Sequence, residues 1–159
     1  MKPIAALLLG TAFLVGGPVM AQAPAAPAAA AVTDPAQFMA GNAKAPGVTV
    51  LPSGLQYKVV QSGPTGPSPK EGDVIKVHYE GSLLSGKVFD TTMNGKPALM
   101  QLAQLVPAWM EALPKMHVGD EWILYVPPAL GYGPEGAGPI PPNSVLVFRL
   151  KLMGMLAAD

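Results

Sequence analysis

Residues 73–90 have the sequence DVIKVHYEGSLLSGKVFD, and this stretch decides the fold. Ile75, Val77 and Tyr79 alternate with polar residues, which is the period of a strand with one buried face. The pair Ser85-Gly86 then favours a tight turn that brings the chain back along the first strand. The stretch therefore predicts an antiparallel hairpin.

Asp90 ends the hairpin and directly follows an aromatic residue, Phe89. A carboxylate at the end of a strand can cap the following turn through Thr91 and Thr92. It can also be the polar group of an otherwise apolar pocket. The hairpin alone leaves both interpretations open.

Three further stretches have strand character: GLQYKVV at 54–60, EWILYVPP at 121–128 and VLVFRLKLM at 145–153. In the first, Leu55, Tyr57 and Val59 should face the core; in the last, a leucine-rich face includes Phe148. Only LVPAWMEALPKM, residues 105–116, has helical spacing, and its prolines limit it to about two turns. We expect an α+β domain in which a curled antiparallel sheet of about five strands wraps around one short helix.

Composition excludes several classes of function. The chain has 159 residues, with ten basic and ten acidic side chains, so its charge indicates neither nucleic acid nor an anionic membrane surface as a partner. It has no cysteine, which excludes a disulfide, a thiolate nucleophile and an iron–sulfur cluster.

The first 21 residues have the pattern of a signal peptide. Lys2 precedes an apolar run from Ile4 to Val15, and small residues surround Ala21. We expect cleavage after Ala21 and no stable membrane insertion after processing, because the run is shorter than the ~20 residues of a spanning helix. An uncleaved anchor helix is the alternative.

The remaining chain divides into three parts. Residues 22–46 are a Pro/Ala-rich tether and a short leading segment, in which Asp34 should cap a helical turn that ends at Gly41 or Asn42. Residues 47–155 are the folded domain, and 156–159 are a C-terminal tail. The tether has no heptads, so we expect a monomer.

Reactive groups are scarce. His78 should lie on the polar face of its strand and His117 in a loop, and both are expected to be solvated rather than general bases or metal ligands. Residues 131–136, GYGPEG, match Gly-x-Gly-x-x-Gly, but the prolines that follow forbid the helix that a dinucleotide site requires. We expect no metal, nucleotide or prosthetic group, and therefore no cofactor.

Five motifs, in this order and spacing, resemble the FKBP family of peptidyl-prolyl cis–trans isomerases: VHYEG, GKVFDTT, LVPAWMEALPKMHVGD, YVPPALGYG and PIPPNSVLVFRLKL. The resemblance covers residues 47–155. The preceding stretch is similar to exported bacterial members of the macrophage infectivity potentiator type, although their long dimerisation helix is missing here. The resemblance implies the FKBP fold for the isomerase domain.

The resemblance also implies a prolyl pocket. Asp90, Tyr79 and Tyr132 would be its catalytic residues, and Trp109 would be its floor. The backbone N–H of Val106 would donate a hydrogen bond to a substrate carbonyl. The complete substrate-binding set would be Phe89, Leu105, Val106, Trp109, Ile140 and Phe148. With this support we favour a pocket role for Asp90 beside its role in the turn.

As a member of the family, the protein would catalyse rotation about X-Pro bonds without covalent chemistry and assist the folding of exported proteins, most naturally in the periplasm. The alternative is a non-catalytic module, such as a chaperone, that holds proline-containing segments in the same cleft. Its partners would be unfolded or extended proline-containing polypeptides, and macrolides such as tacrolimus or rapamycin as ligands. Ala98, Ala108 and Pro139 depart from common family residues and bear on ligand selectivity.

Overall fold

A computed structural model describes residues 34–158 of the chain. The expected signal peptide (1–21) and the Pro/Ala tract that follows it (22–32) lie outside the described residues. The elements, in chain order, are α1 (Pro35–Asn42), β1 (Val48–Val50), β2 (Gln56–Gln61), β3 (Val74–Leu83), β4 (Val88–Thr91), β5 (Ala98–Gln101), η1 (Leu102–Gln104), α2 (Pro107–Ala112), η2 (Leu113–Lys115), β6 (Glu121–Val126), η3 (Pro128–Leu130) and β7 (Leu146–Leu156).

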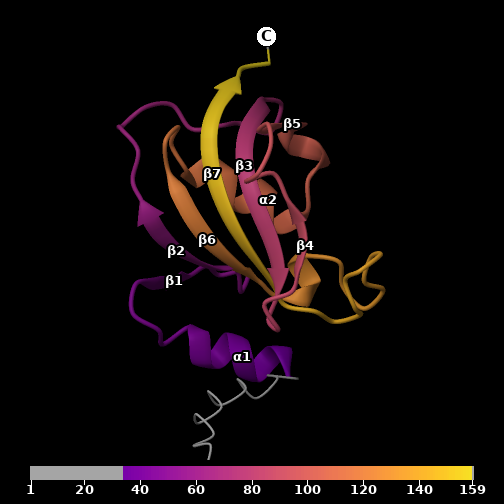
Figure 1. Cartoon of the computed structure of the whole chain (residues 1–159). Coiled ribbons are helices and arrows are strands. Elements are labelled where there is room, and N and C mark those ends of the chain that lie inside the picture. The colour runs from indigo at the N-terminus through magenta and orange to yellow at the C-terminus, as the bar shows by residue number, and fades with distance from the viewer. Residues whose placement is uncertain (1–33, 159) are drawn as a thin grey trace, which may run out of the picture.

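The strands form one antiparallel sheet in the order β1-β2-β6-β7-β3-β4, and β5 also pairs with β3. The two longest strands, β3 and β7, lie at its centre (Figure 1) and pair from Val74↔Leu156 to Leu83↔Leu146. The predicted hairpin is confirmed: β3 and β4 are antiparallel, and Gly86 takes a φ of 83° in the turn between them. A left-handed φ of this kind favours glycine.

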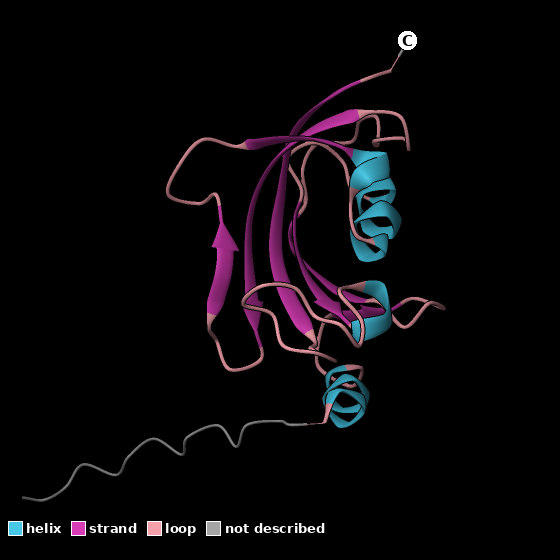
Figure 2. Ribbon diagram, turned by 90° about the vertical axis from the view of Figure 1, so that its right-hand side faces the viewer, coloured by secondary structure: helices cyan, strands magenta, loops and turns pink. Residues whose placement is uncertain are grey.

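Seen from the side, the sheet is curved, and α2 with η2 lies on its concave side (Figure 2). The inner face carries the predicted apolar residues, among them Ile75, Val77 and Leu150, each with no exposed surface. They pack against two buried residues, Trp109 of α2 and Leu113 of η2. The expected architecture, a curled antiparallel sheet around one short helix, is confirmed.

Proline sets both ends of the central helix. Pro107 is the first residue of α2, where its missing N–H breaks no helical hydrogen bond. The α-helix ends at Ala112, and Pro114 lies in the tighter turn of η2. The predicted limit of about two turns is correct.

The sheet has seven strands rather than about five. The additional strands, β1 and β5, have three and four residues. Each is too short for alternation to be recognised in the sequence, and each is defined by its partner, β2 or β3.

The predicted alternation in β2 is wrong at Gln56 and at Val59. Gln56 is buried, with 3% of its surface exposed, whereas Val59 is 42% exposed. The Gln56 amide donates to the Met39 carbonyl (2.7 Å) and accepts from Asn42 Nδ2 (2.8 Å), so docking of α1 covers the polar side of the strand. Val59 lies just beyond the β1–β2 pairing, which ends at Lys58.

The predicted helical turn before the domain is confirmed as α1. Pro35 is its first residue, and the Ala36 N–H donates to the Asp34 carboxylate (2.9 Å). The helix ends at Asn42. It lies against the end of the sheet (Figure 1), where the rings of Phe38 and Tyr125 are 6.2 Å apart. The described residues contain no helix with the length and apolarity that crossing a bilayer requires.

Candidate functional site

A cavity of about 160 Å³ opens between α2 and the inner face of the sheet. We call it the aromatic pocket. A cavity of about 150 Å³ accommodates a benzene ring, so this volume suits one proline ring. The residues that line it are Tyr79, Asp90, Met100, Gln104, Leu105, Val106, Trp109, Tyr132 and Phe148.

Edge-to-face contacts hold the aromatic residues of the pocket in place. The Trp109 ring lies 5.2 Å from Tyr79 and 5.3 Å from Phe148, at interplanar angles of 79° and 85°. Phe89 meets Phe148 in the same way, at 5.7 Å and 87°. Aromatic pairs prefer this geometry, and each contributes about 0.5–1.5 kcal/mol beyond simple burial. The result is a rigid apolar wall.

Gly81 allows these rings to approach the sheet. A Cβ atom at this position would lie 2.6 Å from the Phe89 ring and 2.8 Å from the Phe148 ring. Gly81 pairs with Phe148 on β7, and the β3–β4 register shifts immediately after it. The sequence contains this glycine in VHYEG, but its contact with the rings is visible only in the structure.

The polar side of the pocket is a hydrogen bond from the Tyr79 hydroxyl to Asp90 Oδ2, 2.5 Å long. Burial, followed by this hydrogen bond and the Asp90 charge, raises the pKa of Tyr79 to about 12. The hydroxyl therefore keeps its proton at physiological pH. Asp90 fixes the direction in which that proton points.

The turn after β4 does not depend on Asp90. The Met93 N–H donates to Thr91 Oγ1 (3.1 Å), and the Thr92 N–H donates to the Tyr79 carbonyl (2.8 Å). The threonines and Tyr79 thus supply the acceptors that we expected from Asp90. In the described chain, the Asp90 carboxylate accepts its hydrogen bond from Tyr79 and none from the turn, a geometry that favours the pocket interpretation.

Two hydrogen-bond donors border the cavity. Val106 precedes α2, and the hydrogen bonds formed among residues 34–158 include none from its backbone N–H. Tyr132 is 40% exposed, and its hydroxyl likewise has no partner within the described chain. Both groups can therefore donate to a bound peptide.

Seven of the nine predicted site residues line the aromatic pocket. The other two are not among the lining residues: Phe89 packs edge to face against Phe148, and Ile140 is buried in the core with 6% of its surface exposed. The sequence interpretation missed Met100 and Gln104. Both lie in or next to the short strand β5 and the turn η1, which alternation did not reveal. The departures Ala98 and Ala108 are half-buried and fully buried.

The loop with the sequence GYGPEG has no helix, as expected: residues 131–145 consist of turns and one isolated bridge, Ala137↔Ile140. His78 is not simply solvated. Its Nδ1 contacts the carbonyl (3.1 Å) and Oγ1 (3.3 Å) of Thr92, so it supports the turn outside the pocket. His117 lies near Asp120 (3.8 Å). Residues 34–158 contain no group of three or more His, Cys, Asp or Glu placed to hold a metal ion.

Comparison with known proteins agrees with this geometry. The family described as "FKBP-type peptidyl-prolyl cis-trans isomerase" matches residues 66–153, more than half of the chain. The chain belongs to this family. A second family, "Domain amino terminal to FKBP-type peptidyl-prolyl isomerase", matches residues 17–59. The FKBP match contains every residue that lines the aromatic pocket.

Two curated bacterial proteins are similar to about three quarters of the chain. The "Outer membrane protein MIP" of Legionella longbeachae is 46% identical over 123 residues, which are 76% of this chain and 52% of that protein. An "FKBP-type peptidyl-prolyl cis-trans isomerase FkpA" of Aeromonas hydrophila is 44% identical over 120 residues, 75% of this chain and 44% of that protein. The chain spans about half the length of these relatives.

Solved FKBP structures have the same fold. The crystal structure of a peptidyl-prolyl cis-trans isomerase from Pseudomonas syringae has a TM-score of 0.73 at 35% identity and covers 85% of this chain and 100% of that chain. FkpA from Escherichia coli has a TM-score of 0.75 at 37% identity, over 83% of this chain and 62% of that chain. At 37% and 35% identity, the likeness includes the amino-acid sequence as well as the fold.

Proposed function

We propose that this FKBP-family chain is a peptidyl-prolyl cis–trans isomerase that assists the folding of exported proteins. The aromatic pocket carries the proposal: an apolar cavity with the volume of one proline ring, whose rim holds a fixed Tyr79–Asp90 hydrogen bond and two free donors. Each of these features serves the rotation of an amide bond.

Rotation needs no reactive group. An X-Pro amide isomerises over a barrier of ~18–20 kcal/mol, and no bond to the amide is made or broken. The planar amide has partial charges on nitrogen and oxygen, and the twisted transition state has lost part of that separation. An apolar pocket therefore disfavours the planar state more than the twisted one. Each ~1.4 kcal/mol of this difference accelerates rotation tenfold.

The free donors orient the peptide. The Val106 N–H and the Tyr132 hydroxyl can hold carbonyl oxygens on either side of the proline while the ring packs on Trp109. A proline ring held in this way limits rotation to the X-Pro bond. Asp90, as a carboxylate, accepts hydrogen bonds only, so its contribution acts through the Tyr79 hydroxyl and through its negative charge at the rim.

Asp90→Val should lower kcat/KM for an X-Pro tetrapeptide by about tenfold, less than the ~10²–10³-fold that loss of a donor in direct contact with the reacting atoms costs, because Asp90 acts through Tyr79. Its melting temperature should change little, because Asp90 is exposed and the turn is held by threonines. The assay must follow isomerisation without a coupled protease. Tyr79→Phe is the control: if the hydrogen bond carries the effect, both variants lose similar activity. Full activity in folded Asp90→Val would make the residue structural.

Catalytic efficiency should be nearly constant between about pH 6 and pH 9, because the pKa of Tyr79 is raised to about 12 and no proton moves in the reaction. The raised pKa has a second consequence. Protonated Tyr79 contributes stability below about pH 10, the ordinary range for tyrosine, and that contribution is lost as the pH rises through about 12.

Isomerisation rates from about pH 6 to pH 9 test the first statement, and thermal melts from about pH 9 to pH 12 test the second. His78→Gln and His117→Gln should leave the rate profile unchanged, since neither histidine lines the aromatic pocket. A bell-shaped profile, or a step that disappears in His78→Gln, would show that a proton is transferred or that histidine controls binding.

We also propose that the protein acts outside the cytoplasm, most naturally in the periplasm, as a monomer that begins at Gln22. The pattern of residues 1–21 supports export, and one relative is named an outer membrane protein. Intact mass of protein extracted from the cell envelope tests this. Retention of Met1 would contradict it.

The proposed clients are unfolded or extended proline-containing polypeptides, and macrolides such as tacrolimus or rapamycin are proposed ligands of the same pocket. Ala98 and Pro139 are the positions at which selectivity would differ from that of other members. A non-catalytic chaperone or binding module would hold the same peptides stoichiometrically, without accelerating isomerisation. The tetrapeptide assay separates the two functions.

A further inference from the structure

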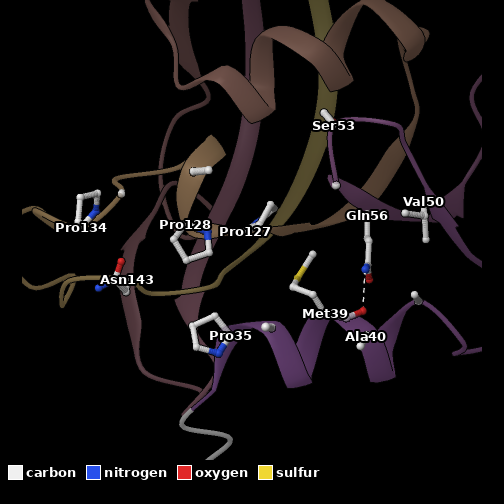
Figure 3. A pocket seen from close by; sticks show the side chains of 15 residues that line it. Pro35, Met39, Ala40, Val50, Ser53, Gln56, Pro127, Pro128, Pro134 and Asn143 are labelled. Carbon is white, nitrogen blue, oxygen red and sulfur yellow. Dashed lines mark hydrogen bonds between the residues drawn. The ribbon is translucent and has the colours of Figure 1, made fainter.

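A second cavity, larger than the aromatic pocket, is a groove of about 680 Å³ between α1, the β1–β2 connection and the segment 127–143, and we call it the α1 groove. Figure 3 shows the two sides of the groove: α1 with Pro35 and Met39 forms one, and the segment with Pro127 and Pro128 forms the other. Its lining residues are Pro35, Ala36, Met39, Ala40, Ala43, Val50, Ser53, Gly54, Gln56, Pro127, Pro128, Ala129, Gly133, Pro134 and Asn143.

The lining of the α1 groove is apolar and uncharged. None of its fifteen residues carries a charge, and ten are proline, alanine, methionine or valine. Two of its three polar side chains are already paired: Gln56 with Met39 and Asn42, and Ser53 with Glu111 (2.6 Å). Such a surface favours an apolar occupant and offers no site for a phosphate or another ion.

The groove is held open by its own hydrogen bonds. The buried Gln56 amide binds both the Met39 carbonyl and the Asn42 side chain, which fixes α1 at the edge of the sheet. Yet no residue of α1 is fully buried, so the helix borders the space without filling it. Apolar side chains such as Val50, 47% exposed, remain in contact with solvent. An occupant would remove this apolar surface from water.

One loop contributes to the lining of both the α1 groove and the aromatic pocket. Tyr132 lines the aromatic pocket, and its neighbours Gly133 and Pro134 line the groove. Residues 132–134 therefore border both cavities, which makes the groove a candidate site for the parts of a polypeptide that flank its proline.

We propose that the α1 groove binds an apolar segment of the same unfolded polypeptide whose proline is isomerised in the aromatic pocket. This inference rests on the proposed isomerase function and names a second subsite for it. Binding at the groove raises the effective concentration of nearby prolines at the aromatic pocket, as tethering does in any two-site interaction. A tetrapeptide that occupies the aromatic pocket has no residues left for the groove, so only long substrates gain.

Val50→Glu tests the proposal, with Val60→Glu as its matched control. Both valines are 47% exposed and lie in neighbouring strands, but only Val50 lines the groove. The measurement is kcat/KM on two substrates: an X-Pro tetrapeptide, and an unfolded protein whose refolding is limited by one prolyl isomerisation. A carboxylate in the groove must be desolvated when an apolar segment binds.

For Val50→Glu we expect about a tenfold loss on the protein substrate, expressed in KM, and less than about a twofold change on the tetrapeptide. Val60→Glu should match the parent chain on both substrates. Met39→Glu in α1 should repeat the selective loss, and Met153→Glu, exposed on β7 outside the groove, should not. A thermal melt of each variant verifies that it is folded.

Several results would overturn the proposal. Equal losses on both substrates, or none, would remove the groove from substrate binding. An effect of Val50→Glu that disappears when residues 22–32 are deleted would assign the groove to the chain's own Pro/Ala tract. A parent dimer in light scattering that Val50→Glu dissociates would assign it to a second copy. Failure of the parent to isomerise the tetrapeptide would overturn the proposed function as well.

Discussion

Phe148→Ala is expected to reduce kcat/KM for an X-Pro tetrapeptide by on the order of 100-fold and to destabilise the domain by ~3–5 kcal/mol. Phe148 lies in the central strand β7, is 4% exposed, and contacts both Trp109 and Phe89 edge to face. Its removal leaves a void in the core and takes away a wall of the aromatic pocket. Denaturant unfolding and the isomerisation assay measure the two effects separately.

Leu150→Ala is the control that distinguishes the loss of a pocket wall from the loss of core packing. Leu150 lies two residues further along the same face of β7, has no exposed surface and does not line the aromatic pocket. Its loss should cost ~2–5 kcal/mol of stability, close to that of Phe148→Ala, while the folded fraction keeps its activity. If the activity of each variant falls only as far as its folded fraction does, Phe148 supports catalysis only by stabilising the core.

Gly136→Ala should cause the second large loss, also on the order of 100-fold in kcat/KM, because misplacing a binding group by about 1 Å can have an effect of that size. A Cβ atom at Gly136 would lie 2.4 Å from the carbonyl oxygen of Ile140, and the residue has a φ of 68°. The loop must rearrange to admit alanine. The Gly136 N–H also donates to the Tyr132 carbonyl (3.1 Å), so the rearrangement should displace a residue of the aromatic pocket.

Gly138→Ala in the same loop is the matched control. Gly138 also has a left-handed φ, 52°, but a Cβ atom there would meet nothing within 4 Å. Alanine should cost only the conformational strain of about 1–2 kcal/mol and leave activity largely intact. Equal losses in both variants would mean that strain in the loop, rather than displacement of Tyr132, limits catalysis.

With the proposed groove subsite, the protein would have two ways to recognise a client. The aromatic pocket would select proline by the shape of its ring, whereas the uncharged α1 groove would respond to apolar side chains in general. An isomerase with both would act preferentially on chains that expose apolar segments near a proline. Unfolded proteins have this property, and folded ones bury those segments.

Local order was predictable from the sequence. Alternation at Ile75, Val77 and Tyr79 identified the central strand, because a strand's side chains point to opposite faces with a period of two. Asp34 with Pro35 marked the start of α1, and Pro107 that of α2, because caps and proline act on the backbone of their immediate neighbours. These features depend on a few consecutive residues.

Most residues of the aromatic pocket were identified in the sequence by several motifs taken together, because no single pocket residue has a reactive group that would reveal it. The resemblance located seven lining residues and gave Asp90 a role in the pocket. It could not show that the turn after β4 is held by threonines, or that His78 binds Thr92. The His78–Thr92 contact joins residues 14 positions apart in the sequence, and the Thr92 N–H of the turn donates to the Tyr79 carbonyl on β3.

The sequence by itself determined the fold class, the central helix and strands, and the aromatic character of the site. Only the tertiary structure decided that Gln56 is buried, that Met100 and Gln104 reach the aromatic pocket, and that an uncharged groove lies beside α1. The physical reason is one of range. Gln56 binds the Met39 carbonyl across 17 positions of sequence, and the α1 groove joins residues from Pro35 to Asn143. Alternation and capping extend over about one turn or one strand, so burial set by a distant element leaves no pattern in the chain.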